Sequence, residues 1–152
     1  MAIQTIFYLK TLTIFFLMLT VSNSTRKLTP NPSDDLFTLP SDLPQDAPWN
    51  ISAKVGSTFS IKIRGNPTTG YSWFLENRNN LNTSMIQALN LSEHGSADYV
   101  TDASEPGMVG VGGYYYFRFS ALAAGDAQLV FIHKRPWETS PIRTVTVNVS
   151  LN

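Results

Sequence analysis

The chain contains no cysteine, and only 14% of its 152 residues are charged. Without thiols it can form no disulfide, no iron–sulfur cluster and no thiolate-ligated zinc site, and it offers no cysteine nucleophile. Stability must therefore come from the burial of its apolar side chains. The length is sufficient for one domain with a substantial core and too short for two.

Residues that catalysis and metal binding need are also scarce. The two histidines, His94 and His133, lie far apart with no acidic or metal-ligating motif beside either. We expect His133 at the edge of the core, and we predict no metal site and no cofactor. The Gly-x-Ser-x-Gly motif is absent, so nothing indicates an enzyme. Acidic and basic residues number 11 each, which gives no reason to expect nucleic acid or an anionic membrane as a partner.

The first 24 residues have the features of a secretory signal peptide. Lys10 is followed by an apolar run from Leu12 to Val21 and then by small residues up to Ser24. This order predicts cleavage after Ser24 and a secreted, lysosomal or vacuolar protein. The alternative is an uncleaved membrane anchor, although the apolar run is shorter than the roughly 20 residues that a span needs.

Acceptor sequences of the form Asn-x-Ser/Thr are consistent with the same route, although such short motifs also arise by chance. One of them, Asn23, lies within the predicted signal peptide. The candidate N-glycosylation sites of the mature chain are Asn50, Asn82, Asn90 and Asn148.

Residues 25–48 carry five prolines and four aspartates and show no apolar periodicity. Proline removes a backbone donor and favours extended conformations. We therefore predict a flexible leader over these residues, followed by one folded domain over residues 49–152.

Beyond Trp49, apolar and polar residues alternate, which is typical of half-buried β-strands. The clearest case is residues 58–64, where Phe59, Ile61 and Ile63 share one face. Strands are predicted over residues 49–55, 58–64, 71–75, 85–91, 114–120, 128–133 and 142–151. Residues 85–91 would also fit a short helix, and residues 92–113 are expected to form one long loop. About seven short strands without a long helix predict an all-β fold, an immunoglobulin-like β-sandwich.

Three turns between these strands have an unusual composition. They are Asn66, Pro67, Thr68, Thr69, Gly70 and Tyr71, then Gly110, Val111, Gly112 and Gly113, then Arg135, Pro136 and Trp137. Proline, β-branched threonine and glycine restrict the first turn to few conformations, so it needs little ordering on binding. The glycine-rich turn has neither the cation nor the following helix of a phosphate loop, and its glycines would permit close backbone approach or a hinge.

Pro136 ends a strand ladder just before Trp137, and polar residues follow, so we expect the indole to be exposed. Exposed aromatic and arginine side chains dominate the energetics of many protein–protein contacts. Together the three turns suggest a binding edge. Each could also be a plain strand connection, and Trp137 could be a core residue.

In this order and at these separations, the three turns resemble those of the chagasin family of cysteine-peptidase inhibitors. The similarity covers about residues 49–152 and includes Val55-Gly56 and Ala123-Ala124-Gly125. The resemblance implies a sandwich whose B–C, D–E and F–G loops lie at one end and enter the active-site cleft of papain-like peptidases, such as cathepsin L-like enzymes. Inhibition would be reversible and noncovalent.

The resemblance also implies a role for each loop. Residues 68–70 of the B–C loop would occupy the catalytic centre, with Thr69 near the Cys–His pair of the enzyme. Residues 110–113 of the D–E loop would run along the non-primed side of the cleft. Arg135 and Trp137 of the F–G loop would grip the primed side.

Residues 92–108 depart from the family pattern, because the segment is long and carries several acids. The preferred enzyme therefore stays open. The alternative function is a secreted adhesion or ligand-binding module that uses the same loop edge.

Overall fold

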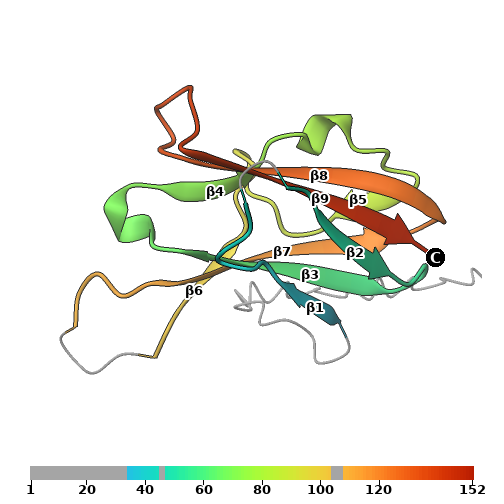
Figure 1. Ribbon diagram of the computed structural model, residues 1–152, viewed down its shortest axis with the longest axis horizontal. Helices are drawn as coiled ribbons and strands as arrows, with labels where there is room; N and C mark the ends of the chain where they lie inside the picture. The colour runs from blue at the N-terminus through green and yellow to red at the C-terminus, as the bar shows by residue number, and fades with distance from the viewer. Residues whose placement is uncertain (1–33, 45–46, 104–107) are drawn as a thin grey trace, which may run out of the picture.

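The structure is a computed structural model that describes residues 34–44, 47–103 and 108–152; the predicted signal peptide lies outside these ranges. Within the described residues, nine strands form two β-sheets packed face to face (Figure 1). One sheet contains β1 (Asp35–Thr38), β3 (Thr58–Gly65), β7 (Gly113–Ala121), β5 (Ile86–Ala88) and β6 (Asp98–Thr101). The other contains β2 (Trp49–Ala53), β9 (Arg143–Leu151), β8 (Gly125–Lys134) and β4 (Ser72–Leu75). The predicted all-β sandwich is confirmed, and all seven predicted segments contain a strand.

The core lies between the two sheets and follows from the period-2 alternation of the strands. β7 alternates along its whole length, which places Tyr115, Phe117 and Phe119 in the core. Phe117 packs against Phe131 of β8 in the other sheet, with ring centroids 4.7 Å apart. Because burying one such ring contributes about 1.5–3 kcal/mol, contacts of this kind hold the sheets together.

The structure differs from the expectation of a flexible leader over residues 25–48. Asp35–Thr38 forms β1, which pairs parallel with β3 at the edge of the five-stranded sheet. Phe37 faces the core, where its ring centroid lies 6.1 Å from that of Phe59, and Leu39 is buried. Phe37 and Leu39 therefore belong to the core, whereas Leu36 is exposed.

Asp34 fixes the beginning of this segment. Its carboxylate accepts a hydrogen bond from the hydroxyl of Thr58 and forms an ion pair with Nε of Arg118 at 3.2 Å. The Asp34 side chain is almost fully buried. The folded domain thus begins ahead of Trp49, which was the predicted boundary.

Residues 92–113, expected to form one long loop, contain β6. β5 and β6 pair one after the other with the same edge of β7, and Asn90 lies between them. Nδ2 of Asn90 donates to Tyr116 O at 2.7 Å, and its Oδ1 accepts from Arg118 N at 2.9 Å. The side chain therefore satisfies the backbone of β7 where the edge ladder is interrupted.

Asn77 does the same in the four-stranded sheet, just beyond the end of β4. Its Nδ2 donates to Gln128 O at 2.7 Å, and its Oδ1 accepts from Val130 N at 2.9 Å. Asparagine side chains therefore continue the ladder in both sheets at points where an edge strand stops.

Replacing Asn90 with alanine should destabilise the fold. The amide of Arg118 and the carbonyl of Tyr116 would lose their partners, and a buried group left unsatisfied costs about 1–3 kcal/mol. We expect Asn90→Ala to lower the free energy of unfolding in urea by about this amount. Asn79→Ala, at an exposed asparagine, should change it little. Equal unfolding curves for wild type and Asn90→Ala would contradict this role of the side chain.

Candidate functional site

Three loops meet at one end of the sandwich. They connect β3 to β4, β6 to β7 and β8 to β9, and Figure 1 shows all three at the left end of the molecule. β3 ends where β7 begins, because Gly65 pairs with Gly113. β8 likewise ends where β4 begins, because Lys134 pairs with Ser72. The register of the two sheets therefore brings the three predicted turns together.

The loop between β3 and β4 is an internally bonded 3-10 turn over Pro67–Thr69. Oδ1 of Asn66 accepts hydrogen bonds from N and Oγ1 of Thr68, at 3.2 and 2.7 Å. Oγ1 of Thr69 donates to Asn66 O at 2.7 Å. Gly70 ends the turn with a φ of 84°, which glycine adopts without strain. Thr68 and Thr69 are exposed on this turn, so the loop presents an ordered surface.

The loop between β6 and β7 contacts this first loop. Gly110 O accepts a hydrogen bond from Nδ2 of Asn66 at 3.0 Å. The two residues before it, Met108 and Val109, are 61% and 94% exposed. Exposed apolar side chains at the tip of a loop are typical of a contact surface when they lie beside others. Neither residue belongs to the predicted motif, which begins at Gly110; an apolar pair next to a glycine is the signal that could have found them.

The loop between β8 and β9 carries Trp137, which is 73% exposed, as predicted. Glu138 N donates to Arg135 O at 3.1 Å and closes a turn around Pro136 and Trp137. Arg135 forms an ion pair with Glu138 at 3.2 Å, and its guanidinium lies 4.6 Å from the centroid of the Tyr71 ring. The arginine is thus held against the first loop while the indole is exposed.

Gly70 lies close to this third loop. A Cβ placed on Gly70 would lie 3.5 Å from Nε of Arg135 and 3.7 Å from the Trp137 ring. The first loop therefore contacts each of the other two, and the three form one continuous surface. The structure brings together all three groups of residues that the sequence singled out.

Trp73 and His133 lie directly beneath the loops. Trp73 is buried, and its Nε1 donates to Arg64 O at 2.9 Å, from β4 in one sheet to β3 in the other. The indole stacks on the imidazole of His133, with centroids 4.7 Å apart and an interplanar angle of 11°, and His133 also contacts the Tyr71 ring. Burial and the positive charge of Arg143 lower the pKa of His133. The half-buried imidazole is a residue of the core edge, as expected.

The chemistry of this end favours contact with a partner. Within the described residues, no group of three or more His, Cys, Asp or Glu could hold a metal ion. The same part of the chain contains no helix that is long and apolar enough to cross a membrane. What the loops expose is threonine, valine, methionine and tryptophan on backbone that is held by internal hydrogen bonds. A protruding, ordered and partly apolar surface can fill a cleft of a partner at little entropic cost.

Residues 52–149 match the family model described as chagasin family peptidase inhibitor I42. Amoebiasin-1 of Entamoeba histolytica is 30% identical over 102 residues, which are 66% of this chain and 88% of Amoebiasin-1. Chagasin of Trypanosoma cruzi is 29% identical over 89 residues, which are 57% of this chain and 73% of chagasin. Among solved structures, the cysteine protease inhibitor EhICP2 of Entamoeba histolytica shares the fold, with a TM-score of 0.57 and 21% identity, over 80% of this chain and 100% of its own.

The lowered pKa of His133 predicts that stability depends on pH. Its ordinary pKa is 6.5 and the folded protein lowers it, so between these two values the unfolded state binds more protons. The free energy of unfolding should therefore fall as the pH decreases from 6.5 through the pKa of the folded state. We expect His133→Gln to remove this part of the dependence, measured by urea unfolding above and below pH 6.5.

The matched control for this experiment is His94→Gln, which removes the other histidine from an exposed loop and leaves the stack on Trp73 intact. Identical pH slopes for wild type and His133→Gln would contradict the assignment to His133.

Proposed function

Because the chain belongs to the chagasin family of peptidase inhibitors, we propose that its three loops together block the active-site cleft of a papain-like cysteine peptidase. The function of the chain is the inhibition of such peptidases. The observation that supports the loops as the inhibitory part is their mutual contact around the 3-10 turn, with Trp137 exposed beside it. We propose that the protein acts as an inhibitor only and has no enzymatic activity.

We assign the centre of the cleft to residues 68–70, with Thr69 nearest to the Cys–His pair of the peptidase. The hydroxyls of Thr68 and Thr69 are both bonded to Asn66, so the loop is ordered before it binds. A disordered residue would lose roughly 1–2 kcal/mol of backbone entropy on binding, and this loop avoids most of that loss. The 3-10 turn also keeps its peptide bonds out of the geometry required for attack. Binding is therefore reversible and noncovalent.

The other two loops lie along the cleft on either side of the catalytic centre. Residues 110–113 follow the non-primed side, and the exposed Met108 and Val109 add apolar contact area there. Trp137 stacks on the primed side. Arg135 already contacts Glu138 and the Tyr71 ring. We therefore propose that it holds Trp137 in place in addition to contacting the peptidase directly.

We also propose that the chain enters the secretory pathway and acts outside the cell or in a lysosome or vacuole. The support for this is the sequence of residues 1–24, in which Lys10 precedes the apolar run from Leu12 to Val21. Papain-like peptidases of those compartments are the corresponding partners.

The four candidate N-glycosylation sites differ in how their side chains are engaged. Asn50 and Asn82 are exposed. Nδ2 of Asn90 donates to two oxygens, at 2.7 and 3.1 Å, and Nδ2 of Asn148 donates to Asn50 at 3.0 Å. Because a glycan replaces one hydrogen of Nδ2, Asn50 and Asn82 are the positions where it would disturb the fold least.

Removing the exposed indole should weaken inhibition strongly. The purified wild type, titrated into papain with a fluorogenic substrate, should abolish activity stoichiometrically and reversibly. Trp137→Ala should raise the inhibition constant roughly 30-fold, because a central aromatic contact contributes about 2 kcal/mol or more. Leu122→Ala is the matched control, since Leu122 is an exposed apolar residue outside the three loops. An equal inhibition constant for wild type and Trp137→Ala would remove Trp137 from the interface.

Signal cleavage predicts that the mature protein begins at Thr25. N-terminal sequencing of protein purified from its own cells should therefore read Thr25 first, and its intact mass should fall to that of the bare chain after enzymatic removal of N-glycans. Recovery of an intact first residue in the membrane fraction would support the anchor instead, and a mass unaffected by deglycosylation would exclude glycans.

A further inference from the structure

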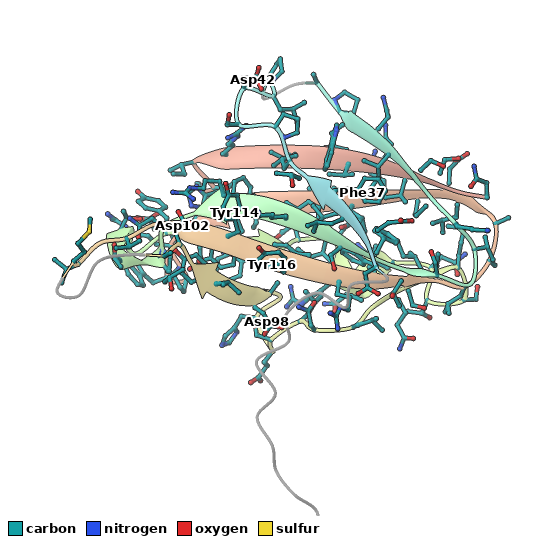
Figure 2. The ribbon with its side chains drawn as sticks, turned by 90° about the horizontal axis from the view of Figure 1, so that it is seen from below. Phe37, Asp42, Asp98, Asp102, Tyr114 and Tyr116 are labelled. Carbon is teal, nitrogen blue, oxygen red and sulfur yellow. The ribbon has the colours of Figure 1, made fainter. Side chains whose placement is uncertain are left out.

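Arg64 and Asp102 form an ion pair at the loop end of the five-stranded sheet. Arg64 is the next-to-last residue of β3, and Asp102 follows β6 immediately. Asp102 N donates to Gly112 O at 2.9 Å, so these two residues form the base of the loop between β6 and β7. Figure 2 shows Asp102 close to Tyr114 at this end of the sheet. Neither Arg64 nor Asp102 belongs to the three motifs considered above.

The guanidinium of Arg64 contacts both sides of the loop base. On one side it donates to the carboxylate of Asp102. On the other, a Cβ placed on Gly112 would lie 2.8 Å from Nη2 of Arg64, so a side chain at this position would displace the guanidinium. The Tyr114 ring supports the guanidinium from beneath the pair, with its centroid 4.9 Å from Cζ of Arg64.

The backbone of Arg64 is itself fixed, because Arg64 O accepts the hydrogen bond from the buried indole of Trp73. A rigid point of the core is thereby connected through one side chain to the base of the loop. A further contact, the hydrogen bond from Nδ2 of Asn66 to Gly110 O, joins the loop between β3 and β4 to the loop between β6 and β7.

We propose that Arg64 is a positioning residue for inhibition, which holds Asp102 and Gly112 so that the glycine-rich turn is presented beside Asn66. The proposal rests on the proposed function of the loops. Arg64 does not need to touch the peptidase; it acts by reducing the freedom that the loop must lose on binding.

Because the Arg64–Asp102 pair is exposed, its role in positioning the loop can be distinguished from a contribution to the stability of the fold. The side chains of Arg64 and Asp102 are 51% and 37% exposed. Exposed ion pairs contribute little to the free energy of unfolding. Removing the pair should therefore leave the fold intact while it loosens the loop.

The test compares Arg64→Gln with Asp102→Asn, which remove opposite charges from the same pair. If these charges acted on the peptidase directly, the two substitutions should shift the inhibition constant for papain in opposite directions. If they act through the pair, both should raise it, roughly three- to tenfold. The double variant should then be no weaker than either single variant. The increase should shrink at high salt, because salt screens the exposed pair in the wild type.

Lys62→Gln is the matched control. It removes the same charge from the same strand, and Nζ of Lys62 lies 3.9 Å from the centroid of the same Tyr114 ring. We expect it to leave the inhibition constant unchanged. Hydrogen exchange tests the effect of the ion pair on the loop base without any peptidase. The Asp102 amide should exchange faster in Arg64→Gln, because its hydrogen bond to Gly112 O opens more often.

The two proposals fail in different ways. A wild type that does not inhibit papain overturns the proposed function, and the exchange rates then still report whether Arg64 holds the loop base. If the wild type inhibits, unchanged exchange at Asp102 overturns the positioning role. So do inhibition constants for Arg64→Gln and Asp102→Asn that stay the same or move in opposite directions.

Discussion

The loop surface depends on one buried indole. Trp73 donates its hydrogen bond from β4 to the carbonyl of Arg64 in β3, and so joins the two sheets where their strands give way to loops. The end of β3 is packed so closely against it that a Cβ on Gly65 would lie 2.7 Å from the Tyr115 ring and 3.3 Å from the indole. The loops therefore begin from strand ends that the core has already fixed. Packing thus sets where each loop leaves the sheets, and the polar contacts within and between the loops hold them from there.

Many small domains gain rigidity from disulfides, which this chain cannot form. Three other kinds of interaction take their place. Aromatic rings from both sheets pack across the core, as Phe117 and Phe131 do. Asn77 and Asn90 continue the backbone ladders where edge strands stop. In the loops, polar side chains bond to nearby backbone and to one another. Together these interactions give the ordered surface that a cleft-filling inhibitor needs.

The long strands with alternating burial had the clearest sequence pattern, and the two strands that the sequence missed are short. β3, β7 and β9 bury one face each, so apolar residues recur at every second position. β1 is short and has one inward aromatic, and β6 is half-buried along most of its length, so neither has a periodic pattern. The loop cluster could be predicted because three motifs occur in a recognisable order. The roles of Asn90 and Arg64 could not, because their partners Arg118 and Asp102 lie 28 and 38 positions away and no local pattern marks them.

The parallel pairing of β1 with β3 determines at which end of the sandwich β1 begins. Since β3 runs toward the loops, Asp34 lies at the opposite end, where Thr58 and Arg118 hold it. Any segment attached ahead of Asp34 would leave the domain on the side remote from the loop surface. A tether on that side, whether to a bilayer, a carrier protein or a solid support, would orient the molecule with its loop surface facing outward and unobstructed.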